Sequence, residues 1–447
     1  MAVYDNGVSM KFYNREKETL FLEKVREKAK KHACFTILKG RRRVGKTSLL
    51  EKAYRGGDYL YFFVARKNEA DLCLDFQAEV ERYFGISLPG QIATVEALFR
   101  YLMELSVREH FTLVIDEFQE FLRVNPSIYS TMQRDWDLYK GKSRLNLVVS
   151  GSINRLMEQI FAADQPLYGR STGDFRLNPF TTPTLKTILK DHGVGDNPEA
   201  LLALWTFTGG VAKYVEQLVD ASAFTLEDMV STLVSESSPI LTEGKVLLVE
   251  EFRKDYGTYF SILSLIASGR TSRSEIENVI GSDVGGYLTK LCDDYSVVAK
   301  KIPFGNDVSR RNMLYQIDDC FLRFWFRFIY RYQSAIELKA YDRLRSLILR
   351  DYPVFSGMAL EQYFRTKLAE SGQWTAIGNW YDRKGENEID IVAVDDLEKR
   401  ILFAEVKRNP ERINPQVLKD RAEAFLQVTP KYSDFTPMFA GYSMGDM

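Results

Sequence analysis

The sequence predicts an α/β protein in which a parallel sheet with crossover helices is followed by helical segments and a second, smaller α/β domain. Three observations predict it. An apolar strand runs through a glycine-rich loop into a helix pattern at residues 34–53, and further apolar strands alternate with helix patterns up to residue 151. Three strand-like runs, a helix pattern and a last strand follow residue 370. The 447 residues suffice for about three domains.

Composition narrows the class of protein. The 60 basic and 61 acidic side chains nearly cancel, so no overall charge draws the chain to nucleic acid or to a membrane. The N-terminus lacks a signal pattern, and no apolar run has the length of a membrane span. Four widely spaced cysteines predict neither a disulfide framework nor a zinc site. We therefore expect a cytoplasmic protein without a membrane partner.

The stretch "CFTILKGRRRVGKTSLL" is the strongest signal for function, because strand, loop and helix follow one another in the order of a phosphate-binding loop. Glycines let consecutive backbone N–H groups turn toward phosphates at the helix N-terminus. Lys46 is expected on the outer phosphates and Thr47 on Mg²⁺. The predicted nucleotide-binding residues are Gly40, Arg41, Arg42, Arg43, Val44, Gly45, Lys46, Thr47 and Ser48.

A second apolar strand, "FTLVIDEF", ends in two acids that complete a P-loop NTPase site. Asp116 is expected to hold the magnesium ion, and Glu117 to act as general base on the attacking water. A third buried strand, "LNLVVSGS", ends where AAA-type ATPases place a polar sensor, so Ser152 is predicted at the nucleotide. ATP and Mg²⁺ are the expected cofactors.

Taken together, "FYNREKE", "GRRRVGKTSLL", "VIDEFQEF", "PLYGRSTGDFRLNPF" and "GGVAKYV" resemble the archaeal-type ATPases, a branch of the STAND and AAA+ class that also occurs in bacteria. The resemblance implies a helical lid after the ATPase core. It also implies a base pocket at Phe12, Arg15 and Glu16, and a role for Arg170 on the γ-phosphate of a neighbouring subunit or moving domain. The family usually has proline where this chain has Ala212, which departs from the expected lid pattern.

Beyond the core, the predicted domains are a helical lid, a winged helix with an aromatic packing helix, and a C-terminal domain. With the ATPase core at 1–180, their borders are 181–250, 251–335 and 336–447. Residues 251–331 carry 12 basic and 10 acidic side chains, a weak excess for reading DNA. A basic group is expected around the wing, at Lys300, Lys301, Arg310 and Arg311. A structural or partner-binding role is preferred for this region over DNA binding.

The order of elements after residue 356 (helix, three strands, helix, strand) is that of the PD-(D/E)xK phosphodiesterase fold. Asp390 and Glu405 fall in neighbouring strands, and Lys407 alternates with Glu405 onto the same face. With Glu361 from the preceding helix, these acids predict a Mg²⁺ or Mn²⁺ site with Lys407 as a catalytic partner. The alternative is an ion pair between Lys407 and one of the acids.

The sequence thus predicts an ATP-hydrolysing P-loop ATPase whose nucleotide state controls a metal-dependent nuclease-like domain. Two other functions stay open. One is an ATP-switched signalling or assembly protein in which the C-terminal module is catalytically silent, with a protein partner or a second copy of the chain. The other is a DNA-binding regulator that uses the winged helix. DNA and RNA are both open as partners.

Overall fold

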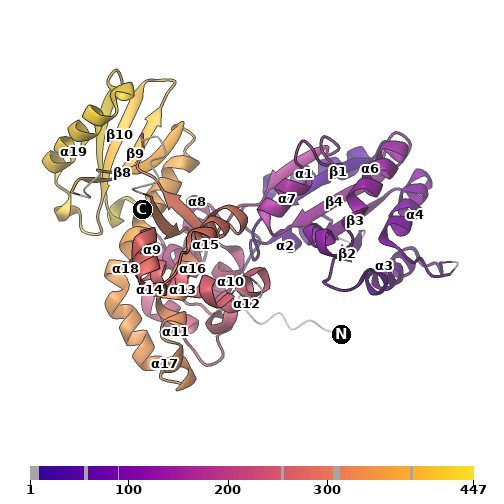
Figure 1. Cartoon of the computed structure of the whole chain (residues 1–447), viewed down its shortest axis with the longest axis horizontal. Helices are drawn as coiled ribbons and strands as arrows, with labels where there is room; N and C mark the ends of the chain where they lie inside the picture. The colour runs from indigo at the N-terminus through magenta and orange to yellow at the C-terminus, as the bar shows by residue number, and fades with distance from the viewer. Residues whose placement is uncertain (1–9, 55–58, 89, 253–255, 306–312, 383–385) are drawn as a thin grey trace. The chain divides into compact units, whose positions relative to one another are not determined.

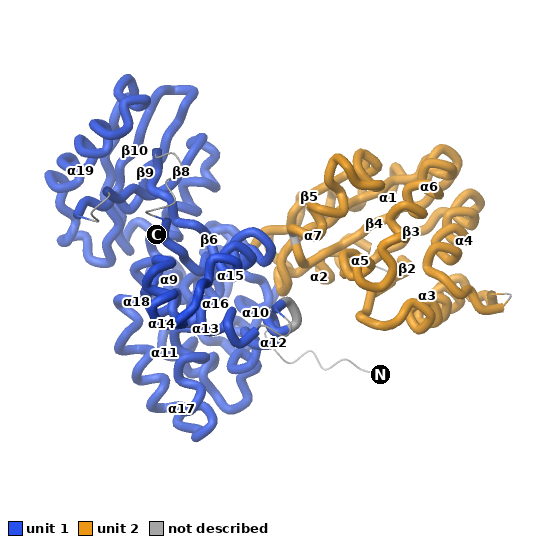
Figure 2. Tube along the Cα trace, in the orientation of Figure 1, with its two compact units in different colours: residues 1–11, 180–447 blue, residues 12–179 orange. Residues whose placement is uncertain are grey.

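The computed structural model describes residues 10–54, 59–88, 90–252, 256–305, 313–382 and 386–447. Two compact units make up the chain (Figure 2). The unit called the first here is Phe12–Pro179, which is orange and labelled unit 2 in Figure 2; the second comprises Met1–Lys11 with Phe180–Met447, which is blue and labelled unit 1. The chain therefore passes from one unit to the other twice, after residue 11 and after residue 179.

The first unit is built on a five-stranded sheet with the order β2-β3-β4-β1-β5. Every neighbouring pair of strands is parallel. The central strands are buried along their whole length because helices cover both faces of the sheet. The strands are β1 Cys34–Lys39, β2 Leu60–Phe63, β3 Phe111–Asp116, β4 Leu145–Gly151 and β5 Gly173–Arg176. The parallel sheet with crossover helices is confirmed, and β5 is an addition to the predicted strands.

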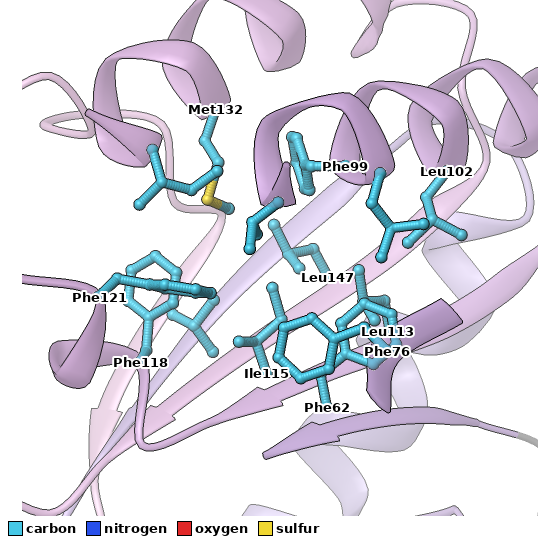
Figure 3. Close-up of a cluster of buried hydrophobic side chains, with 14 of the residues drawn as sticks. Phe62, Phe76, Phe99, Leu102, Leu113, Ile115, Phe118, Phe121, Met132 and Leu147 are labelled. Atoms are coloured by element: carbon cyan, nitrogen blue, oxygen red, sulfur yellow. The ribbon is translucent and has the colours of Figure 1, made fainter. Parts of the chain in front are cut away.

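Helices of the first unit divide between the two faces of the sheet. Strand alternation directs Leu113 and Ile115 into one hydrophobic core with helices α3, α4 and α6, and Val114 into the other with α1 and α2. Figure 3 shows the larger core, in which Phe62, Phe76, Phe99 and Leu147 meet. The helices are α1 Glu16–Ala29, α2 Lys46–Ala53, α3 Glu69–Phe84, α4 Val95–Arg108, α5 Phe121–Val124, α6 Ile128–Tyr139 and α7 Asn154–Ile160.

Five helices follow Phe180 in the range where the lid is predicted. Helices α8 and α9 start where the side chains of Thr181 and Asn197 cap the first turn, each followed by a proline. The α9–α10 turn needs glycine, because Gly210 has φ +74° and a Cβ there would lie 2.5 Å from the Phe180 carbonyl oxygen. These helices are α8 Thr182–Asp191, α9 Pro198–Thr208, α10 Ala212–Asp220, α11 Leu226–Leu233 and α12 Ile240–Phe252.

Three helices and a two-stranded antiparallel sheet follow, in the order expected of a winged helix. They are α13 Tyr256–Ala267, α14 Arg273–Ile280, α15 Gly285–Thr289, β6 Val298–Lys301 and β7 Leu314–Ile317. The aromatic packing helix expected after β7 is α16 Cys320–Phe324, which passes into a π-helix, Trp325–Tyr330, and is followed by α17 Gln333–Glu337. Arg323 is 2% exposed, because aromatic side chains pack around the whole helix and not around part of it.

A long helix and a mixed sheet complete the unit (Figure 1). The sheet order is β11-β10-β9-β8, with β8, β9 and β10 antiparallel and β11 parallel to β10. Helix α18 Tyr341–Glu370 precedes β8 Ala376–Tyr381, β9 Glu388–Asp395 and β10 Arg400–Val406, which are followed by α19 Pro415–Val428 and β11 Thr436–Tyr442. The predicted order of helix, three strands, helix and strand is confirmed. However, Glu361 lies well inside α18 and not in its first turns, because the helix begins at Tyr341 and continues through Pro353.

Helical and sheet segments of the second unit are joined by specific contacts. The Phe304 amide donates to the Asn379 carbonyl at 2.7 Å, and the Tyr381 hydroxyl donates to the Lys301 carbonyl at 2.9 Å. The expected domain borders after residues 250 and 335 fall inside helices α12 and α17. Among the described residues, no helix combines the length and apolarity needed to span a bilayer.

Candidate active sites

The glycine-rich loop joins the carboxyl end of β1 to α2, so its backbone N–H groups lie at the start of a helix. Two residues of the loop have left-handed backbone conformations, Arg43 with φ +67° and Gly45 with φ +97°. Gly40 is needed for close packing, because a Cβ there would lie 2.8 Å from the Leu177 carbonyl oxygen. The backbone conformations of Arg43 and Gly45 turn the loop from β1 toward α2.

Lys46 lies beneath the loop and is 8% exposed. Its Nζ donates to the carbonyl oxygens of Gly40 at 2.8 Å and Arg41 at 3.3 Å. Burial lowers the pKa of Lys46, and the nearby carboxylates of Glu117 and Asp116 oppose that shift. Thr47, in contrast, is exposed in the first turn of α2.

Asp116 ends β3, and three hydrogen bonds hold its carboxylate. Oδ1 accepts from the Ser150 hydroxyl and from the Glu117 amide, the latter at 3.0 Å. Oδ2 accepts from the Tyr61 hydroxyl at 2.8 Å. The sequence pattern did not indicate Ser150 or Tyr61, since both contacts depend on how β2, β3 and β4 align.

Glu117 follows with a left-handed backbone conformation, φ +53°. Its Oε2 accepts a hydrogen bond from the Ser152 hydroxyl at 2.7 Å and another from the Gln119 amide. Ser150 and Ser152 alternate at the end of β4, and each holds one of the two acids. The structure thus brings the predicted Ser152 to the predicted general base, together with Gln119, which the sequence reasoning missed.

Of the three residues expected in the base pocket, Arg15 is buried against the loop. It is 5% exposed, and its Nη2 donates to the carbonyl oxygens of Asn178 at 2.7 Å and Val44 at 3.5 Å. Burial lowers its pKa, although Glu18 and Glu16 oppose that effect. Phe12 is 37% exposed, and Glu16 is exposed at the start of α1. Arg15 thus binds the loop backbone.

Arg170 lies near the amino-terminal ends of the strands of the sheet. Its Nε and Nη2 bond to Asp137 Oδ2 of α6 at 3.1 and 2.8 Å. The residue just precedes β5, whose first residue Gly173 pairs with Thr36 near the start of β1. The phosphate loop follows the end of β1. Arg170 is therefore not brought to the phosphate loop of its own chain.

A second charged site lies in the C-terminal sheet. β9 and β10 are antiparallel with Ile391 opposite Ala404, which places Asp390 beside Glu405. Lys407 Nζ lies 3.1 Å from Asp390 Oδ2 and 3.4 Å from Glu405 Oε1. The Val406 amide also donates to Asp390 Oδ2, at 2.8 Å. The structure therefore brings together the three residues that the sequence pattern indicates.

Further groups surround this site. Arg365 Nη1 lies 3.5 Å from Glu361 Oε2 and 3.1 Å from the Asp390 carbonyl oxygen, while Arg421 Nη1 lies 3.7 Å from Glu405 Oε1. Burial and then the charge of Asp390 raise the pKa of Glu361. Burial acts to lower the pKa of Lys407, but Asp390 and Glu405 outweigh it, and the net shift is upward. Within the residues that the structure covers, no three metal-ligating side chains form a ready cation site.

The basic residues of the wing are partly paired. Lys300 lies 3.1 Å from Asp293, and Lys301 lies 3.3 Å from Glu388 of β9. Arg310 and Arg311 lie outside the described residues. In the lid, Lys213 pairs with Glu216 on α10 at 2.8 Å.

Two parts of the sequence match known protein families. Residues 12–218 match a family described as an ATPase domain predominantly from Archaea, and residues 325–416 match a family described as "Archaea bacterial proteins of unknown function". Uncharacterized protein MJECL04 of Methanocaldococcus jannaschii is 28% identical over 409 residues, which cover 89% of this chain and 87% of that protein.

Among solved structures, the Walker-type ATPase paby2304 of Pyrococcus abyssi has a similar fold, with a TM-score of 0.53 and 21% identity. The match covers 71% of this chain and 96% of that one. The likeness concerns the fold, whereas the two family matches concern the sequence. Residues 12–218 are thus similar to archaeal ATPase domains, and residues 325–416 are similar to the second family.

Proposed function

We propose that this protein binds ATP and hydrolyses it at the carboxyl edge of the first sheet. The observation that carries the proposal is that the buried Lys46 lies near the carboxylates of Asp116 and Glu117. All three lie beside a loop in which two residues have left-handed backbone conformations. The loop amides and Lys46 would bind the phosphates. Lys46 would then replace its hydrogen bonds to the Gly40 and Arg41 carbonyls with hydrogen bonds to phosphate oxygens. Glu117, held by Ser152, would accept the proton of the attacking water.

The donor atoms at this site suit magnesium. Thr47 offers an exposed hydroxyl and Asp116 a carboxylate, and hard oxygen ligands are those that Mg²⁺ prefers. Bound with the nucleotide, the ion would offset phosphate charge. Thr47 and Asp116 are the residues that would hold it.

Two further roles belong to the proposal. Phe12, Arg15 and Glu16 precede the loop and would shape the base pocket, with Arg15 fixing the loop backbone from below. Arg170 lies near the amino-terminal ends of the strands, whereas the phosphate loop follows the carboxyl end of β1. Arg170 would therefore act only on a nucleotide that is bound to a second copy of the chain.

Lys46→Ala tests the nucleotide site. We expect loss of fluorescent ATP-analogue binding by about a hundredfold or more, because one charge-assisted contact to phosphate and its electrostatic preorganisation are removed. Lys31→Ala, which changes an exposed lysine between α1 and β1, is the control and should bind as the wild type does. Equal binding by all three proteins would contradict the proposed site.

The C-terminal site supports a second proposal, a metal-dependent phosphodiester cleavage controlled by nucleotide state. Glu361, Asp390, Glu405 and Lys407 lie on one side of an αβββαβ domain. The carboxylates are oxygen donors of the kind that Mg²⁺ and Mn²⁺ take, but Lys407 Nζ now lies between two of them. A cation would therefore have to displace this ammonium group. The ion pairs with Lys407 balance the charges of the buried Asp390 and Glu405 carboxylates.

Asp390→Ala tests cleavage. Single-stranded, double-stranded and branched DNA and RNA are incubated with Mg²⁺ or Mn²⁺, with and without ATP. If the site cuts, wild-type protein cleaves at least one substrate, and Asp390→Ala loses about a hundredfold or more of that rate, because one of the two paired carboxylates is gone. Asp396→Ala, which changes an exposed acid just after β9, serves as control. Absence of cleavage by the wild type under every condition would contradict the second proposal.

The two other candidate functions can each be tested separately. An ATP-switched signalling or assembly protein would change its oligomeric state with nucleotide and cleave nothing. A DNA-binding regulator would bind DNA with a steep salt dependence and weaken when Lys300, Lys301, Arg310 and Arg311 are neutralised. Each of these proposals is for a cytoplasmic protein.

A further inference from the structure

A tyrosine on the edge strand of the first sheet contacts the acid proposed to hold magnesium. Tyr61 lies on β2 opposite Val114 of β3, so Tyr61, Val114 and Asp116 point to one face of the sheet. Its phenol extends along that face, and its hydroxyl donates to Asp116 Oδ2 at 2.8 Å. The contact joins residues 55 positions apart in the sequence.

Asp116 depends on this contact for the orientation of one oxygen. Oδ1 is held by Ser150 and by the Glu117 amide, whereas Tyr61 is the one donor to Oδ2 among the described residues. A carboxylate held at both oxygens keeps its plane, and one held at a single oxygen can rotate. Partners of this kind around a metal-holding carboxylate commonly tune metal affinity.

Tyr61 is itself held in place. Its ring packs against the core formed by α2 and the central strands, and it lies 6.3 Å from the ring of Tyr59. A phenol carries its proton at neutral pH, so the Tyr61 hydroxyl can donate to Asp116 Oδ2.

We propose that Tyr61 is a positioning residue that orients Asp116 and so sets the Mg²⁺ concentration needed for nucleotide binding and turnover. The inference rests on the proposed ATPase function. It assigns to the edge strand a part in the site that the phosphate-loop and acidic patterns do not include.

Tyr61→Phe removes the hydroxyl and keeps the ring. We expect the Mg²⁺ concentration for half-maximal ATP hydrolysis to rise about tenfold, the lower end of the effect seen for such partners. Binding of a fluorescent ATP analogue in EDTA should not change, because the phosphate loop is untouched. Tyr59→Phe, two residues earlier on the same face, should match the wild type in both measurements.

The Asp116→Asn background separates positioning from a general effect on the fold. There, Tyr61→Phe should cause no further change in the Mg²⁺ dependence of nucleotide binding. A wild-type Mg²⁺ dependence in Tyr61→Phe, equal shifts in Tyr61→Phe and Tyr59→Phe, or an added shift in the Asp116→Asn background would each overturn the inference. A wild-type protein that binds nucleotide with Mg²⁺ but never hydrolyses it would instead contradict the ATPase proposal, and the binding arm would still test Tyr61.

Discussion

Glu117 adopts a backbone conformation that is uncommon for a residue with a long side chain. Its φ of +53° costs on the order of 1 kcal/mol or more, and such strain persists where neighbouring contacts fix it. Ser152 and Gln119 both donate to its carboxylate, so the strained backbone turns this acid toward the end of β4. The general base proposed here is thus held before nucleotide arrives.

Lys46 and Arg15 show how the loop is stabilised by two buried cations with separate partners. Lys46 donates to carbonyl oxygens at the start of the loop, and Arg15 donates to Val44 within it and to Asn178. Burial lowers the pKa of both side chains. Nucleotide phosphates would compete for Lys46, while Arg15 is bonded on the side of the loop that faces Asn178.

At the scale of elements, the segment that follows strand β10 contacts helix α9 of the predicted lid. Arg408 follows Lys407 directly, and its guanidinium bonds to both carboxylate oxygens of Glu199 on α9, at 2.9 and 3.0 Å. It also donates to the Ser356 hydroxyl of α18 at 2.7 Å and lies over the ring of Tyr352. The side chain that follows Lys407 therefore joins the long helix α18 to α9.

Arg408→Ala should lower the free energy of unfolding of the second unit by about 1–2 kcal/mol, because a two-point ion pair and aromatic packing are lost, although Glu199 is partly screened by solvent. Denaturant unfolding monitored by tryptophan fluorescence measures it, since Trp205, Trp325, Trp374 and Trp380 all lie in this unit. Arg412→Ala, an exposed arginine in the same loop, is the control. Equal stability of both variants and the wild type would contradict this role.

Sequence patterns identified the elements that carry periodic signals and missed contacts between distant strands. Lys46, Asp116 and Glu117 follow from local spacing, and so do the alternation of Glu405 with Lys407 and the order of the C-terminal elements. Tyr61 and Ser150 could not be found in this way, because their contacts depend on the register of β2, β3 and β4. The burial of Arg323 could not be predicted from the sequence, because a run of aromatic residues gives no direction to the buried face.

For the whole molecule, the two compact units change the expected domain picture. Helices α8 to α18, the β6–β7 pair and the C-terminal sheet belong to a single unit, while the five-stranded parallel sheet and its helices form the other. The chain crosses between them near Phe12 and near Phe180. Arg15 lies close in sequence to the first crossing, and its partner Asn178 lies close to the second.

The central claim is that this fold hydrolyses ATP with Glu117 as general base. The most direct test is the turnover of ATP by Glu117→Gln beside the wild type, with Mg²⁺ and nucleotide both saturating and nucleotide binding measured on the same samples. We predict binding within about threefold of the wild type and turnover reduced about a hundredfold or more, the contribution of a positioned general base. Turnover by Glu117→Gln at the wild-type rate would contradict the account.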